Sequence, residues 1–259
     1  MKSCLNCNTS NLPDEANFCP VCGQVLEKSN MDLSFNLRGV TFIMKYVEGG
    51  TFMMGEDCYV DYDERPQHEV KLDSYYIGET QVTQELWKAV MGDNPSKFIG
   101  NKLPVENVSW NDCKKFIEKL NIITGKSFNL PTEAQWEYAA RGGINAVAES
   151  CNDVMQESWN NENSDRETHP VGKKRANPLG LYDVLGNVWE WCSDYYSKKY
   201  YSDSPYKNPS GPISGSNRVL RGGSWETSPN LCRVTRRIDY RPGYSNSFTG
   251  LRLALKSNL

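Results

Sequence analysis

Four cysteines near the N-terminus have the spacing of zinc ligands. Cys4 and Cys7 form one CxxC pair, Cys19 and Cys22 form a second, and eleven residues separate the pairs. Four thiolates can surround one Zn²⁺ tetrahedrally, and each CxxC turn can present two sulfurs to the same ion. A segment this short cannot fold by apolar burial alone, so metal binding would supply most of its stability. We therefore predict a zinc ribbon over residues 1–24.

Nine short motifs follow one another between residues 38 and 255. They are VEGGTFMMG at 47–55, ERPQHEV at 64–70, QVT at 81–83, PVENVSW at 104–110, LPTEAQWEYAARGG at 130–143, NPLGLYD at 177–183, GNVWEW at 186–191, RGGSW at 221–225 and GLRL at 250–253. Each motif is modest alone, but the ordered set closely resembles the formylglycine-generating enzyme (sulfatase-modifying factor) family. The resemblance implies an irregular α+β domain over residues 38–259, a variant of the C-type lectin fold, which a polar linker at 25–37 joins to the ribbon.

The same resemblance implies a copper site after the RGGSW motif. Enzymes of the family hold copper(I) between two cysteines, at the third and eighth positions after the motif serine, and oxidise a substrate cysteine with oxygen. Here Cys232 stands at the eighth position after Ser224, but Thr227 stands at the third. Two sulfurs suit this soft ion, whereas a hydroxyl is a poor ligand for it. We therefore expect copper oxidase activity to be missing, with Cys232 and Ser224 as the catalytic candidates if any remains.

A ligand groove is the second site that the resemblance implies. The family positions of Trp189 and Ser224 lie near the groove in which the enzymes bind their substrate. We expect Trp189, Trp225, Thr227 and Arg233 to line it here. The alternative is that the tryptophans only pack in the core, since large aromatic rings need no functional explanation there.

A calcium site is the third site that the resemblance implies. Asp183, Gly186, Val188 and Glu190 match the positions that bind calcium in family members. Two carboxylates and backbone carbonyls on a turn are suitable hard-oxygen ligands. The alternative is a turn cap and a buried polar tether without an ion.

Three functions remain open at this point. The first is a module that binds a peptide or protein in the enzymes' groove. The second is a copper-dependent oxidase that converts a substrate cysteine to formylglycine, in which Cys58, Cys113, Cys151 or Cys192 replaces the missing ligand. The third is a variable ligand-binding face, as in some lectin-fold proteins, because residues 227–249 lack Lys, Glu, Gln, Met and Trp but are rich in Asn, Ser, Thr, Tyr and Arg. Such a composition also arises by accident in a short, turn-rich segment.

The overall composition argues against two classes of partner. A net charge of −3 and a pI near 5.6 give no electrostatic reason to bind nucleic acid or an anionic membrane. No run of about 18 apolar residues is present, and the N-terminus does not resemble a secretory signal. We therefore expect a cytoplasmic protein whose nine cysteines are reduced or bind metal.

The elements that position these residues can be placed from capping patterns and periodicity. We expect three helices, each starting after a hydroxyl residue and stopping at glycine: Thr83–Gly92, Ser109–Gly125 and Thr132–Gly142. We expect strands at 42–47 and 49–55 around a glycine turn and another at 68–72, where apolar and polar residues alternate.

Overall fold

The computed structural model describes residues 7–10, 12, 19–23, 31–57, 62–145 and 154–257. The chain divides into two compact units, Met1–Asp32 and Leu33–Leu259. The second unit starts earlier than expected. Residues 33–37, which we assigned to the linker, form the strand β1 and pair with β2, Leu33 opposite Met44.

The larger unit is built on two main sheets. Five strands follow the order β1-β2-β5-β13-β6, and four follow the order β11-β10-β9-β12. The five-stranded sheet contains β1 (Leu33–Leu37), β2 (Val40–Val47), β5 (Tyr75–Gly78), β13 (Ala254–Lys256) and β6 (Phe128–Asn129). The four-stranded sheet contains β11 (Arg237–Tyr240), β10 (Arg218–Arg221), β9 (Trp189–Tyr195) and β12 (Thr249–Gly250). The combination of helices with short, mostly antiparallel strands confirms the expected α+β class.

Two pairs of short strands complete the β-structure. One pair is β3 (Gly50–Met54) with β4 (His68–Leu72), and the other is β7 (Ser158–Trp159) with β8 (Leu185–Gly186). The sequence predicted strands at the positions of β2, β3 and β4. The glycine turn does not make β2 and β3 a hairpin, however, because β2 pairs with β5 and β3 pairs with β4.

The three expected helices are confirmed together with their N-terminal caps. They are α1 (Gln84–Met91), α2 (Trp110–Thr124) and α3 (Glu133–Ala140). Ser109 and Thr132 each open a full capping box, and the Thr83 hydroxyl accepts from Leu86 N at 3.3 Å. Two further helices are single turns, α4 (Val154–Glu157) and α5 (Tyr200–Asp203), and three 3₁₀ turns are η1 (Tyr62–Glu64), η2 (Gly143–Asn145) and η3 (Pro229–Leu231).

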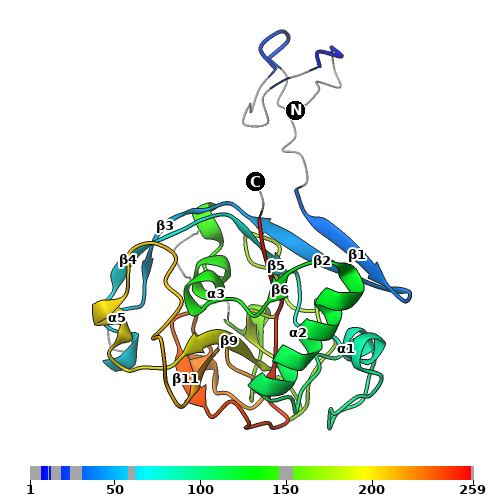
Figure 1. Ribbon diagram of the computed structural model, residues 1–259, viewed down its shortest axis with the longest axis vertical. Coiled ribbons are helices and arrows are strands. Elements are labelled where there is room, and N and C mark those ends of the chain that lie inside the picture. The colour runs from blue at the N-terminus through cyan, green and yellow to red at the C-terminus, as the bar shows by residue number, and fades with distance from the viewer. Residues whose placement is uncertain are drawn as a thin grey trace. The chain divides into compact units, whose positions relative to one another are not determined.

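Two apolar clusters hold the unit together. One lies between the five-stranded sheet and the helices α1 and α2, which run side by side in Figure 1, and it includes Trp189 and Trp191. The other surrounds α3 and contains Trp136 and Tyr138. Both clusters reach β9, so the sheet that carries the GNVWEW motif is packed from two sides.

Candidate functional site

The loop after β10 brings together the two positions that matter for copper. Gly222 and Gly223 have φ of 98° and 85°, a region that suits glycine, and they turn the chain sharply into Ser224. A Cβ built on Gly223 would lie 3.0 Å from Cys232 Sγ and 3.6 Å from Thr227 Cγ2. Thr227 and Cys232 therefore meet against the same glycine, as the family resemblance implies.

The Thr227 hydroxyl is already used by the loop itself. Ser224 N donates to Thr227 Oγ1 at 2.9 Å, and Thr227 N donates back to Ser224 O at 2.9 Å. The hydroxyls of Ser224 and Thr227 are 3.1 Å apart. These bonds engage the Thr227 side chain at the position where the family's enzymes have their first cysteine.

The Cys232 thiol is buried and neutral. Its residue is 3% exposed, and burial raises its pKa to about 12. Sγ lies 4.0 Å from Thr227 O, a weak contact. A thiolate is the form that binds copper and reacts with electrophiles, so this environment opposes both.

The rate of alkylation measures how accessible and how ionised the Cys232 thiol is. At pH 8, we expect iodoacetamide to modify Cys232 in the folded protein roughly 1000-fold more slowly than in the urea-unfolded chain, because so little thiolate is present. Peptide mass spectrometry after timed quenching gives both rates. Equal rates would mean that the thiol is exposed and ionised.

Two of the four expected groove residues, Trp189 and Trp225, are packed inside. Trp189 is 6% exposed and belongs to an apolar cluster, and Trp225 is 9% exposed, with Nε1 donating to Ser247 O at 2.8 Å. Arg233 is half-buried and forms a two-pronged ion pair with Glu64, at 2.7 and 2.9 Å. Of these residues, only Thr227 and Arg233 keep appreciable exposure.

A segment that the sequence did not point to covers the loop. Asn161 N donates to Thr227 O at 3.0 Å, and Ser164 Oγ donates to Trp225 O at 2.8 Å. Ser158 lies near enough to Cys232 to offset part of the rise that burial causes in the pKa of its thiol. Residues 158–164 therefore lie over the Ser224–Cys232 loop and restrict access to the thiol.

The predicted calcium ligands converge, but a side chain is at their centre. Backbone oxygens of Asp183, Gly186 and Val188 lie 3.1, 3.3 and 2.9 Å from Gln81 Nε2, and Glu190 Oε1 lies 3.1 Å from it. Asp183 contributes its carbonyl oxygen here, while its Oδ2 accepts from Gly172 N at 2.8 Å. Gln81 belongs to the QVT motif, whose only sequence signal was its place in the ordered set.

Buried ion pairs fix the elements around these two sites. Arg252 donates to both oxygens of Glu190, and Trp136 Nε1 donates to Glu190 Oε2 at 2.7 Å. Arg221 is fully buried and pairs with Glu137. Arg237 forms a two-pronged pair with Glu133, at 2.6 and 2.8 Å. Arg221 and Arg237 tie α3 to the strands β10 and β11, and the Trp136 indole ties it to β9.

An open cavity of about 840 Å³ lies beside the end of the β10–β11 hairpin. It is lined by Ser216, Asn217, Asp239, Tyr240, Arg241, Pro242, Gly243 and Tyr244. The rings of Tyr240 and Tyr244 are 4.3 Å apart, and Tyr244 is 41% exposed. Much of this lining falls within residues 227–249, the segment whose composition favoured recognition.

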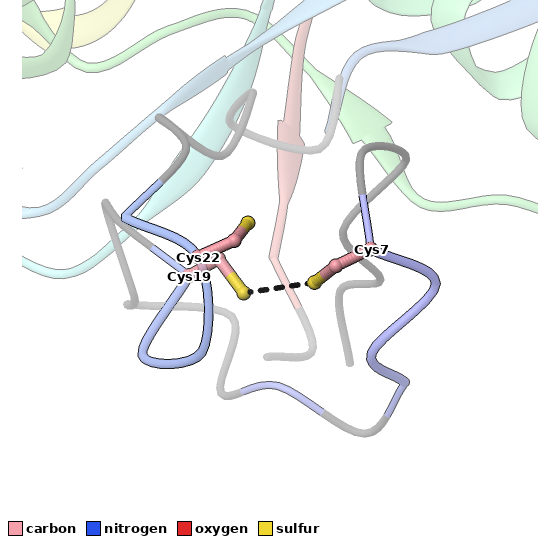
Figure 2. Close-up of side chains that lie close together, drawn as sticks. All are labelled: Cys7, Cys19 and Cys22. Carbon is pink, nitrogen blue, oxygen red and sulfur yellow. Dashed lines mark hydrogen bonds between the residues drawn. The ribbon is translucent and has the colours of Figure 1, made fainter.

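In the small N-terminal unit, three of the four predicted zinc ligands are described. The sulfurs of Cys7, Cys19 and Cys22 lie within 4.8 Å of one another, and Figure 2 shows Cys7 and Cys19 pointing toward each other, 3.5 Å apart. A hydrogen bond from the Thr9 hydroxyl lowers the pKa of Cys7, which favours the thiolate. Cys4 is outside the described residues. The arrangement is compatible with a metal site.

Known proteins resemble between 60% and 88% of this chain. A solved structure, Treponema denticola variable protein 1, is 36% identical, has a TM-score of 0.82, and covers 88% of this chain and 99% of its own. The serine/threonine-protein kinase pkn1 of Chlamydia caviae is 33% identical over 82% of this chain, which spans only 37% of that relative. The formylglycine-generating enzyme of Streptomyces coelicolor is 38% identical over 60% of this chain and 54% of its own length.

None of the described helices has the length and apolar character needed to cross a membrane.

The family described as "Sulfatase-modifying factor enzyme 1-like domain" matches residues 40–257. The chain therefore belongs to the formylglycine-generating enzyme (sulfatase-modifying factor) family, and its larger unit has the family's C-type-lectin-like α+β fold.

Proposed function

We propose that this protein is a peptide- or protein-binding member of the family that lacks copper oxidase activity. The observation that carries the proposal is the pairing of Thr227 with Ser224 beside a buried Cys232 thiol. One neutral thiol and one committed hydroxyl do not fit copper(I), which takes two thiolates. This loop therefore does not offer the donor set that copper(I) takes.

The cavity beside β10 and β11 is the proposed ligand face. Its lining offers two adjacent tyrosines, the exposed Arg241, and Asp239, which accepts a hydrogen bond from Asn217. Tyrosine supplies large contact area with little loss of side-chain freedom, and arginine and asparagine supply adaptable hydrogen bonds. The similarity to a protein named a variable protein also supports a recognition role.

The cavity can be tested by selecting random linear peptides on the immobilised full chain. We expect selected peptides to bind the Tyr244→Ala variant at least about tenfold more weakly, because a central aromatic anchor carries much of such an interface. The matched control is Tyr206→Ala, since Tyr206 is similarly exposed (49%) but does not line the cavity. The Cys232→Ser variant should bind as the native protein does. Selected peptides that tolerate Tyr244→Ala but not Cys232→Ser would overturn this assignment.

The runner-up function is oxidation of a substrate cysteine. It is favoured by Cys232, which lies against Thr227 as the enzymes' second cysteine would. We expect no aldehyde when copper-treated protein is incubated with oxygen and a Cys-x-Pro-x-Arg peptide. The Thr227→Cys variant is the informative partner, because it restores the two-sulfur donor set. Aldehyde from the native protein, detected by mass spectrometry, would make it an enzyme.

The N-terminal unit is proposed to bind one zinc ion. Sulfurs bonded to a common Zn²⁺ at about 2.3 Å are separated by roughly 3.8 Å, close to the Cys7–Cys19 separation of 3.5 Å. Metal analysis of the purified chain should find about one zinc, which is lost when Cys19 and Cys22 are both replaced by serine. The Cys113→Ser variant, altered at a buried cysteine of the larger unit, should keep its zinc. Zinc retained without Cys19 and Cys22 would show that the ion binds elsewhere.

A further inference from the structure

Gln81 occupies the point on which four oxygens converge. Its side chain is buried, and it reaches a turn about a hundred residues away in the sequence. The turn has the form needed to aim carbonyl groups inward, because Asp183, Gly186 and Asn187 all have positive φ, at 53°, 80° and 61°. The oxygens lie 2.9–3.3 Å from the nitrogen. That is the spacing of N–H···O hydrogen bonds, whereas calcium holds its oxygens at about 2.3–2.6 Å.

The charge of Glu190 is already balanced by Arg252. Arg252 contacts Glu190 through both Nε and Nη2, with Nη2 2.8 Å from Oε1, and both side chains are fully buried. Arg252 also donates to the backbone oxygens of Gly78 and Tyr182. A divalent cation placed among the four oxygens would share Glu190 with this guanidinium group and be repelled by it.

We propose that the Gln81 carboxamide takes the place of the calcium ion in this protein. The two N–H donors of its NH₂ group are shared among the three carbonyls and Glu190, and Arg252 neutralises the carboxylate. The turn at 183–190 is thereby assembled from the chain's own groups, and its stability does not depend on calcium.

Two buried oxygens define the competing arrangement. Among the described residues, neither Gln81 Oε1 nor Asp183 Oδ1 has a hydrogen-bond partner. Reversing the carboxamide would put a fifth oxygen at the centre, which is what a calcium shell would need. The two arrangements differ in one measurable property, the response of the native protein to calcium.

The first experiment titrates calcium into the zinc-loaded full chain in calcium-free buffer, by calorimetry and by thermal unfolding. We expect no binding heat and a change in the unfolding midpoint of less than about 1 °C. One-to-one binding with a raised midpoint would overturn the proposal and make Gln81 a ligand. This measurement needs no variant, so it decides the question even if a substitution prevents folding.

The second experiment converts the site. Gln81→Glu replaces the donor with a carboxylate, so calcium should now raise the midpoint by about 5 °C or more when present in large excess. Gln84→Glu is the matched control: Gln84 is also buried and its amide also donates to two carbonyls, at 2.8 and 3.1 Å, but it lies outside the four-oxygen turn. The Gln84→Glu variant should have a lower unfolding midpoint than the native protein, and calcium should not raise it. An absence of any calcium effect on Gln81→Glu would show that the four oxygens cannot hold a cation, and would overturn the substitution of an amide for an ion.

Discussion

Replacing Arg221 with methionine is expected to destabilise the larger unit by about 3–5 kcal/mol, because it leaves Glu137 buried without its main partner. Both side chains are completely buried and paired. Burial alone would raise the pKa of Glu137, but Arg221 and Arg141 hold it below its ordinary value. Arg221 also donates to the backbone oxygens of Thr235 and Arg236, so the variant loses these two hydrogen bonds as well.

Urea unfolding followed by tryptophan fluorescence would measure the loss. The control is Arg175→Met, which breaks an exposed ion pair with Glu157 and should cost no more than about 1 kcal/mol. Glu137 supplies a second readout. Its lowered pKa contributes stability above the ordinary carboxyl pKa, and that stability fades as the pH falls. In the variant, Arg221 no longer offsets the burial that raises the pKa of Glu137, so protonation relieves the buried charge, and the gap in unfolding free energy between native protein and variant should narrow from pH 7.5 toward pH 5. A constant gap of less than 1 kcal/mol would refute the assignment.

Gly186→Ala is expected to cause a loss of similar or greater size. Gly186 has a φ of 80°, and an added Cβ would lie 2.2 Å from the backbone oxygen of Trp159 and 2.7 Å from its nitrogen. Neither atom belongs to a flexible side chain, so the strands β7 and β8 would have to separate. That movement would also disturb the carbonyl that Gly186 presents to Gln81.

The variant Gly92→Ala measures the cost of a positive φ without the steric clash that Gly186→Ala adds. Gly92 also has positive φ, 93°, but a Cβ there meets nothing within 4 Å among the described residues. We expect Gly92→Ala to lower the free energy of unfolding by about 1–2 kcal/mol, because of the backbone conformation alone. Gly186→Ala should exceed that value clearly and lower the yield of folded protein. Equal losses for the two variants in thermal unfolding would mean that β7 moves aside without cost.

The sequence predicted what depends on neighbours along the chain. The helices at 84–91, 110–124 and 133–140 follow from caps three residues away, and the N-cap of each was found; the glycine C-cap was found for the first two, whereas the third ends at Ala140 with Arg141 as its C-cap. The convergence of Thr227 and Cys232 followed from the family motif, since five residues of one loop span it. The side chain at the centre of the calcium positions could not be found this way. Gln81 is more than a hundred residues from the turn that it joins.

Long-range partners also limited the prediction of the ligand groove. Aromatic type alone does not distinguish Trp189, packed in the core, from Tyr244 at the surface. The cover formed by residues 158–164 has no signature, because it acts mainly through backbone groups and short polar side chains. Which arginines are buried depends on acids brought together only by folding, such as Glu133 with Arg237.

The place of β13 in the five-stranded sheet has a consequence for biosynthesis. Leu255 pairs with Tyr76 on one side and with Phe128 on the other, so residues 254–256 fill an interior position between strands made much earlier. Until those residues leave the ribosome, β5 and β6 each present an open edge, and such edges pair readily with other chains. The five-stranded sheet can therefore be completed only after these three residues have been synthesised, and until then the edge of β5 is open to pairing with other chains.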